Sequence, residues 1–115
     1  MQINQYEIWI VDLNPQIVTD SSKSWPVLIV QTNFLNKILH PSTIICPITT
    51  NVQNDSDILR VHVKKGTANL NDNCDIMIDQ IRAIDNKRLV KKVGKLTTEL
   101  IEKIKENISI VINLE

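Results

Sequence analysis

The chain has 115 residues, of which 43% are hydrophobic and 23% charged, and its formal net charge is zero. This length supports a single hydrophobic core, so we expect one domain that spans residues 1–115. Zero net charge argues against a protein that coats nucleic acid non-specifically, although it is compatible with a local basic groove for a short RNA segment. No apolar run is long enough to cross a membrane and the N-terminus lacks a secretory signal, which predicts a cytoplasmic protein with no membrane partner.

The first half of the chain predicts three strands and one short helix. Residues 6–13 alternate and are rich in aromatic and β-branched side chains, which is typical of a strand. Residues 14–24 are polar and predict a long loop, after which the apolar run of residues 25–31 predicts a strand buried on both faces. We expect a short helix over residues 33–39, ended by the proline that follows, and a third strand over residues 43–48.

The second half predicts shorter strands and a closing helix. Residues 59–64 alternate between apolar and polar side chains, the pattern of a strand with one face in water. Further strands are expected over residues 75–79 and 90–93. Thr97 is a good N-cap for a helix whose apolar side chains share one face: Leu100, Ile101, Ile104, Ile108, Val111 and Ile112. Successive strands followed by one helix predict an antiparallel, barrel-like α+β domain.

Several kinds of chemistry are excluded by the same sequence. Its two glycines lie far apart, so there is no glycine-rich phosphate loop. Cys46 and Cys74 lack the spacing of a metal-binding pair and are expected to be buried apolar residues. His40 and His62 have no neighbouring cluster of acids or cysteines, and His62 is most simply a solvent-facing strand residue. We therefore expect no metal site and no cofactor.

Four segments are similar to one known family. They are residues 7–15 (EIWIVDLNP), 23–30 (KSWPVLIV), 47–51 (PITTN) and 79–85 (DQIRAID). Together they resemble the MazF/PemK/Kid family, the toxins of type II toxin–antitoxin systems, which are ribosome-independent endoribonucleases (mRNA interferases). The resemblance implies a small antiparallel SH3-like β-barrel with a C-terminal α-helix, assembled as a homodimer.

The resemblance also implies a substrate and partners. Single-stranded RNA would be cleaved sequence-specifically and without a metal, leaving a 2′,3′-cyclic phosphate and a 5′-hydroxyl. Such cleavage needs groups that remove a proton, stabilise charge on the phosphorane oxygens and protonate the leaving 5′-oxygen. The expected partner is a cognate antitoxin whose C-terminal segment is disordered when free, and operator DNA would be bound only through the antitoxin complex.

The family's functional positions can be carried over one by one. Its catalytic set falls on Asp20, Lys23, Trp25 and Thr49. Asp20 stands where the family commonly has glutamate, and Trp25 stands where it usually has arginine. The RNA-binding set falls on Ser21, Ser22, Thr50, Asn51, Gln80 and Arg82.

Simpler roles remain open for some of these residues. Threonines that follow a strand, as Thr49 and Thr50 do, are often turn formers. Asp79 and Arg82 are expected to brace the barrel through a salt bridge rather than to act in catalysis.

Trp25 leaves two functions open. Its indole offers one neutral N–H, which cannot replace the charge-assisted hydrogen bonds of a guanidinium, and losing one preorganised donor costs roughly two to three orders of magnitude in rate. A substitute cation has to come from Lys23 or from one of the three arginines, Arg60, Arg82 and Arg88. Trp25 itself is suited to stacking on an RNA base. The alternatives are a working endoribonuclease with a rebuilt cation arrangement and a catalytically weakened toxin-fold protein that binds an antitoxin as a regulatory module.

Overall fold

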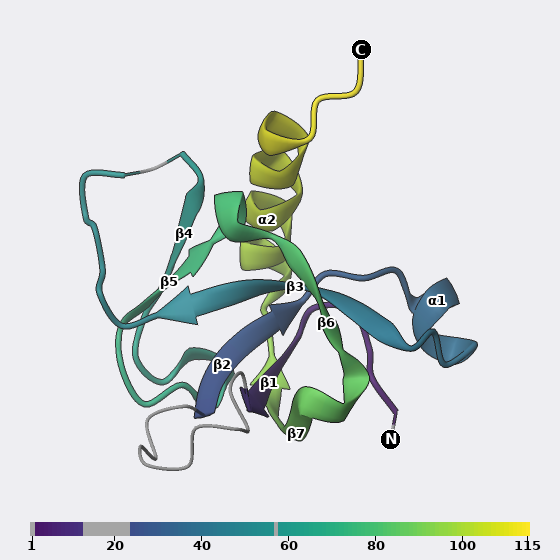
Figure 1. Ribbon diagram of the computed structural model, residues 1–115. Helices are drawn as coiled ribbons and strands as arrows, with labels where there is room; N and C mark the ends of the chain where they lie inside the picture. Colours follow the sequence, from purple (N-terminus) through teal and green to yellow (C-terminus); the bar gives the residue numbers. More distant parts are fainter. Residues whose placement is uncertain (1, 13–23, 57) are drawn as a thin grey trace.

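The fold is an antiparallel sheet of seven strands with one long helix packed against it (Figure 1). The computed structural model describes residues 2–12, 24–56 and 58–115. Neighbouring strands follow the order β4-β5-β3-β2-β1-β7, and β6 pairs with the free part of the β3 edge. The strands are β1 (Glu7–Asp12), β2 (Ser24–Ile29), β3 (Ser42–Thr49), β4 (Arg60–Val63), β5 (Cys74–Met77), β6 (Arg82–Asp85) and β7 (Leu89–Lys95).

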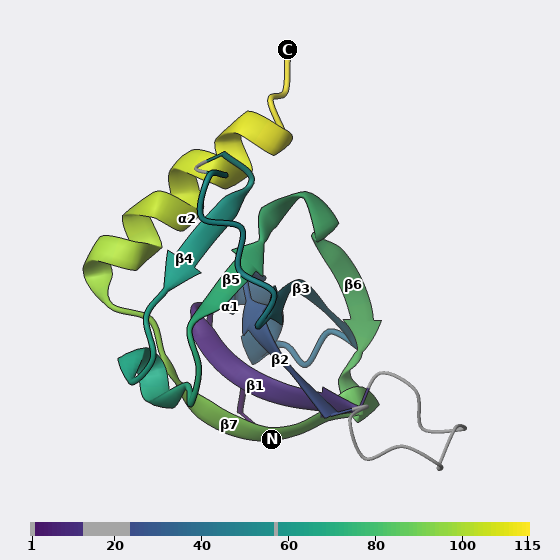
Figure 2. The ribbon, with the colours of Figure 1, turned by 90° about the vertical axis from the view of Figure 1, so that its left-hand side faces the viewer.

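Two α-helices lie at different ends of the molecule. The short α1 (Asn33–Lys37) follows β2 and lies at the end opposite β4 and β5 (Figure 1). The longer α2 (Thr98–Val111) runs alongside β4, on the side of the molecule away from β6 (Figure 2). Neither of them, within the described residues, is long and apolar enough to span a bilayer.

The central strands are buried on both faces because alternate side chains enter two separate cores. On β1, Ile8 enters the core beneath α2, whereas Trp9 and Val11 enter a second core on the opposite face. β2 divides in the same way, with Leu28 in the first core and Val27 in the second. The apolar run predicted to be buried on both faces is therefore confirmed.

The predicted fold class is confirmed, but the barrel is open. No strand pairing joins β4 to β7 within the described part of the chain. A 3-10 helix, η2 (Thr67–Asn69), bridges this gap instead: the Asn69 side chain donates to the Val93 carbonyl at 2.9 Å. The β1–β7 pairing also shifts register twice, which bends the edge of the sheet at this side.

Gly94 on β7 is required by this bridge. A methyl group at Gly94 would lie 2.3 Å from the Ala68 carbonyl oxygen, a backbone atom that cannot turn aside. We expect Gly94→Ala to lower the free energy of unfolding by roughly 1–3 kcal/mol, the usual cost of overpacking. Urea denaturation measures this cost, with the exposed neighbour Lys95→Ala as the control. An unchanged midpoint for Gly94→Ala would contradict the close approach.

The C-terminal helix begins where the sequence predicts. The Thr97 hydroxyl accepts a hydrogen bond from Leu100 N at 3.3 Å, which confirms the N-cap. Ile104 is fully buried, but Ile112, predicted on the same face, ends the helix and is 45% exposed. Asn107 is buried instead, because its side-chain oxygen accepts from Leu59 N at 2.7 Å and so fastens the helix to the start of β4.

Other strand predictions need small corrections. All four residues of β5 are buried, because the polar side of this strand is covered by the segment that follows β3. Ser24, predicted as the last loop residue, is the first residue of β2. The rest of the predicted loop, residues 14–23, lies outside the described residues.

Candidate functional site

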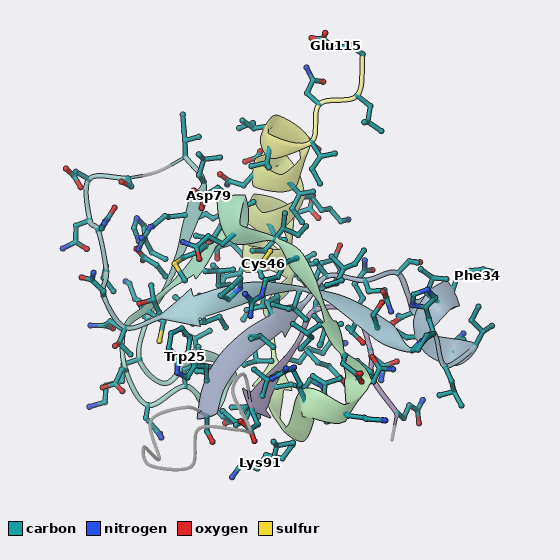
Figure 3. The ribbon with its side chains drawn as sticks, in the orientation of Figure 1. Trp25, Phe34, Cys46, Asp79, Lys91 and Glu115 are labelled. Atoms are coloured by element: carbon teal, nitrogen blue, oxygen red, sulfur yellow. The ribbon has the colours of Figure 1, made fainter. Side chains whose placement is uncertain are left out.

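Strand register brings Trp25 and Thr49 to the same face of the sheet. β2 and β3 pair as far as Val27 and Pro47. Two residues further along each strand come Trp25 and Thr49, and residues two apart share a face. Trp25 is 42% exposed, at the beginning of β2 (Figure 3). The sequence prediction that these two residues belong to one site is therefore compatible with the register.

Thr49 forms a turn where β3 ends. Its hydroxyl oxygen accepts a hydrogen bond from Asn51 N at 3.1 Å, so the turn-forming role left open by the sequence is confirmed. A hydroxyl also has one proton to donate, which this bond leaves available for a second partner. Thr50 and Asn51 follow on the surface.

A groove of about 980 Å³ opens beside this turn. It lies between the segment after β3 and the β4–β5 hairpin. Its lining includes exposed lysines and amide side chains, which suits a polyanion with hydrogen-bonding bases. Its lining residues are Thr50, Asn51, Val52, Asn54, His62, Val63, Lys64, Lys65, Asn73 and Cys74.

A buried carboxylate stands next to Thr49 on the neighbouring strand. Asp75 on β5 is the cross-strand partner of both Thr49 on β3 and His62 on β4. Directly opposed residues in an antiparallel sheet project to the same face, so the three side chains form a row. Asp75 Oδ1 contacts His62 Nδ1 at 2.6 Å, and Asp75 Oδ2 contacts Arg60 Nη1 at 3.1 Å.

Hydrogen bonds favour the ionised form of the Asp75 carboxylate although the side chain is fully buried. Burial by itself would raise its pKa. The hydrogen bonds from Gln53 N, at 2.9 Å, and from His62 and Arg60 outweigh burial, so the pKa lies below its ordinary value of 3.8. Both oxygens are thereby engaged, and the group is held rigidly.

This cluster of Arg60, His62 and Asp75 was missed from the sequence. His62 was predicted to face solvent, and its side chain is 35% exposed, but its ring is also bonded to Asp75, a residue 13 positions away. The signal was present in two places. Arg60 and His62 are two residues apart and so share one face of a strand. Asp75 interrupts an otherwise apolar strand, where a buried charge needs partners.

Gln80 and Arg82 do not join the groove. Gln80 ends the 3-10 helix η3 (Ile78–Gln80) and Arg82 begins β6, which pairs with the other half of β3. Both are exposed, and neither lines the groove beside Thr50. The predicted salt bridge between Asp79 and Arg82 is wrong: both side chains are exposed, and no ion pair joins these two described residues.

The remaining predicted site residues are in the first long loop. Asp20, Ser21, Ser22 and Lys23 lie outside the described residues, so their roles stay predictions. The ends of that loop meet beside Trp25, since Asp12 pairs with Ser24. The backbone carbonyl of Asp12 accepts a hydrogen bond from Arg88 Nη1 at 3.2 Å.

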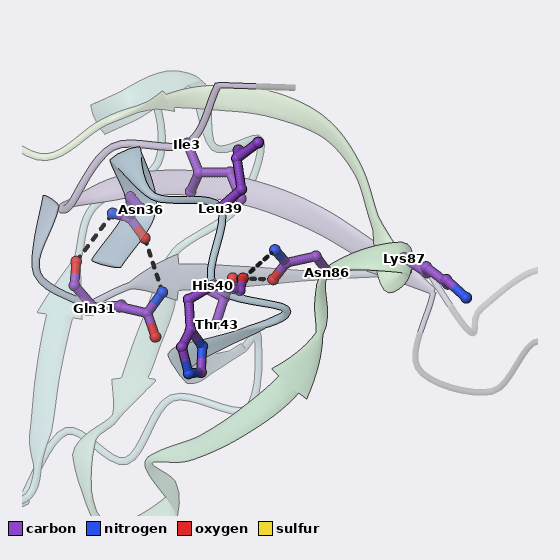
Figure 4. A pocket seen from close by; sticks show the side chains of 8 residues that line it. All are labelled: Ile3, Gln31, Asn36, Leu39, His40, Thr43, Asn86 and Lys87. Atoms are coloured by element: carbon purple, nitrogen blue, oxygen red, sulfur yellow. Dashed lines mark hydrogen bonds between the residues drawn. The ribbon is translucent and has the colours of Figure 1, made fainter. Parts of the chain in front are cut away.

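A second hollow, of about 240 Å³, lies beside α1 (Figure 4). Its polar groups satisfy one another. Gln31 and Asn36 exchange hydrogen bonds of 3.0 and 3.1 Å, and the Asn86 amide donates to the His40 carbonyl at 2.7 Å while its oxygen accepts from the Thr43 hydroxyl. Such a closed network fixes the turn after α1 rather than recognising a ligand.

Neither cysteine is a nucleophile. Burial, followed by the charge of Asp79, raises the pKa of the Cys46 thiol to about 12. Burial also raises the pKa of Cys74, with smaller contributions from Asp72 and Asp75. A thiol needs to lose its proton to attack, so both are packing residues, as expected. Among the described residues no group of three or more metal-binding side chains is found.

Comparison with known proteins defines the class. The family model for the PemK-like, MazF-like toxin of type II toxin–antitoxin systems matches residues 4–112. The chain therefore belongs to this family of toxins.

Particular relatives agree with this assignment. The chain is 26% identical to Endoribonuclease EndoA of Bacillus subtilis over 99% of its own length and 97% of that protein. Its fold is similar to toxin MazF-mt6 of Mycobacterium tuberculosis, with a TM-score of 0.75 and 23% identity over 95% and 98% of the two chains. It is also similar to a MazE–MazF structure from Deinococcus radiodurans, with a TM-score of 0.77 and 9% identity over 100% and 99%.

Proposed function

We propose that this toxin is an endoribonuclease that cleaves single-stranded RNA at the face carrying Trp25 and Thr49. The observation that carries the proposal is the turn of Thr49 beside the groove, on the face of the sheet that the register also gives to Trp25. The name of the Bacillus relative, an endoribonuclease aligned over nearly the whole chain, supports the same activity.

The proposed chemistry uses the RNA's own 2′-hydroxyl as the nucleophile. The 2′-oxygen bonds to phosphorus as the bond to the 5′-oxygen breaks, which leaves a 2′,3′-cyclic phosphate and a 5′-hydroxyl without need of a metal. Thr49 donates a hydrogen bond to a phosphorane oxygen, and a proton from solvent reaches the leaving 5′-oxygen. Asp20 takes the 2′-hydroxyl proton and Lys23 adds positive charge; both assignments come from the family resemblance.

The groove accounts for binding of the RNA chain around the cleaved bond. Lys64 and Lys65 neutralise phosphates at the hairpin end of the groove. Amide side chains such as Asn51 and Asn73 present donors and acceptors to base edges of an unpaired strand. The exposed indole of Trp25 offers a base a stacking surface.

We also propose a cytoplasmic location and the partners of the family for this protein. It forms a homodimer, and it binds an antitoxin whose C-terminal segment folds on binding; operator DNA is reached only through that complex. A neighbouring structure of this fold is an endoribonuclease with its cognate antitoxin from Mycobacterial species. On this chain Phe34, Ile38 and Leu39 expose an apolar patch at α1, a feature typical of an interface.

A second candidate function is an antitoxin-binding module with little or no cleavage activity. The observation that favours it is Trp25 in the position where the resemblance implies a catalytic arginine. The two candidates differ in one measurable property, RNA cleavage by the purified protein.

A cleavage assay tests the proposal. A long unstructured RNA is incubated with the protein in the presence and absence of a chelator, and the product ends are analysed. We expect cleavage that survives the chelator, ends in cyclic phosphate, and falls about a hundredfold in Thr49→Ala, since one preorganised donor is lost. Thr49→Ser keeps the hydroxyl and is the matched control. A folded protein that leaves the RNA intact would favour the binding module.

A further inference from the structure

Arg60 reaches the turn formed by Thr49 from the far strand of the sheet. Its Nη1 atom donates to the Asn51 carbonyl oxygen at 3.0 Å. The N–H of the same Asn51 donates to the Thr49 hydroxyl. One residue therefore connects the guanidinium to the hydroxyl, and no other described arginine or lysine has a hydrogen bond to the Thr49–Asn51 turn.

Asp75 holds this guanidinium in place. The same Nη1 contacts Asp75 Oδ2 at 3.1 Å, and the carboxylate is itself fixed by Gln53 N and by His62 Nδ1. Asp75 is fully buried, and the Arg60 side chain is 17% exposed. A cation held by a buried, fully bonded acid is preorganised, so little reorganisation is needed when a charged ligand arrives.

The guanidinium keeps donors for a ligand. It has five N–H groups in a planar fork, and both contacts that the structure gives it among the described residues use Nη1. Nε and Nη2 add further donors of the same fork. A guanidinium can grip two oxygens of a phosphoryl group, which a lysine cannot do.

The other arginines lie elsewhere. Arg88 donates to the Asp12 carbonyl at the base of the first loop. Arg82 is on β6, paired with Ile45 in the half of β3 that is far from Thr49. Of the three arginines, Arg60 is thus the one whose position is tied to the Thr49 turn.

We propose that Arg60 is a catalytic residue whose guanidinium stabilises the phosphorane at Thr49, with Asp75 as its positioning residue. This inference rests on the proposed RNA cleavage. As the 2′-oxygen bonds to phosphorus, the phosphoryl oxygens gain negative charge, and Arg60 donates hydrogen bonds to them without giving up a proton. The 2′-hydroxyl proton passes to the general base and a proton from solvent reaches the leaving 5′-oxygen. Arg60 thereby supplies the charge that the indole of Trp25 cannot provide.

Single-turnover cleavage of an unstructured RNA tests this role. We expect Arg60→Gln to lower the rate constant by roughly a hundred- to a thousandfold while RNA affinity changes by only a few-fold. Millimolar guanidinium should partly restore Arg60→Gln and leave Thr49→Ala unchanged, a rescue that a merely structural role would not produce. Arg88→Gln is the matched control, and circular dichroism checks that each variant is folded.

The outcomes separate the two claims. Full activity in Arg60→Gln, with activity lost in Thr49→Ala, would overturn the role of Arg60 and leave the proposed function intact. A wild-type protein without cleavage activity would overturn both. If Arg60→Gln does not fold, Arg60→Lys is measured instead. Lysine keeps the positive charge beside Asp75 but lacks the planar fork, so we expect the cleavage rate to fall at least tenfold. Activity of Arg60→Lys equal to that of the wild type would overturn the inference.

Discussion

Trp25→Arg is expected to restore RNA cleavage to the Arg60→Gln variant by about a hundredfold. Trp25 and Thr49 lie two residues beyond the last β2–β3 pair, on one face of the sheet, so an arginine at position 25 brings a guanidinium to Thr49 from the side opposite Arg60. The gain follows from replacing a lost electrostatic donor at the phosphorane. Single-turnover rates of the double variant measure it.

Two comparisons make this result specific. Trp25→Gln in the Arg60→Gln background removes the indole without adding charge and should restore nothing. Trp25→Arg in the wild-type background should change the rate less than tenfold, because Arg60 already supplies a cation. A gain of several orders of magnitude there would show instead that the site lacks a cation and that Trp25 weakens the toxin. Because Trp25 is 42% exposed, a guanidinium there can reach water, and we expect the free energy of unfolding to change by about 1 kcal/mol or less.

Asp75→Ala is expected to lower the free energy of unfolding by roughly 3–5 kcal/mol, because it leaves the charge of Arg60 and the N–H of Gln53 without their acceptor. The residue is fully buried, so its carboxylate is shielded from water in the folded protein. Urea denaturation at pH 7 measures the loss. The exposed Asp72→Ala, in the same hairpin, is the control and should cost less than about 0.5 kcal/mol. Equal effects of the two substitutions would contradict the anchoring role of Asp75.

The same carboxylate predicts how stability depends on pH. Its pKa in the folded protein lies below the ordinary value of 3.8, so its contribution is complete above that pH and is lost as the pH falls through the lower folded value. Glu7 acts in the same direction. Burial opposes ionisation there, but hydrogen bonds from Trp9, Lys92 and Asn4 lower its pKa from 4.5. We expect the wild type to lose stability below about pH 4.5 and Glu7→Gln to lose less across that range; parallel acid-denaturation curves would contradict this.

The sequence was sufficient to place most of the elements, because their signals are local, but it did not predict β6. Alternation marked β1 and β4, the apolar run marked β2, and Thr97 marked the start of α2. The four family segments together indicated the toxin fold, which the family model over residues 4–112 confirms. An open barrel could not be foreseen, because closure depends on whether β4 and β7 meet in space, and there η2 lies between β7 and the β4–β5 hairpin.

The residues of the candidate site also fall into those that the sequence indicated and those that only the structure revealed. Thr49 and Trp25 could be named from the family resemblance, since each lies within one of its motifs, PITTN and KSWPVLIV. Arg60 and Asp75 could not, because they are 15 residues apart and have meaning only through cross-strand pairing. The sequence by itself determined the family and most of the strands, and the family resemblance marked Trp25 as a position where arginine is usual. Only the tertiary structure decided that Arg60 is the cation at the Thr49 turn. Its contact with the buried Asp75 depends on which strands pair, and strand pairing cannot be read from positions along the sequence.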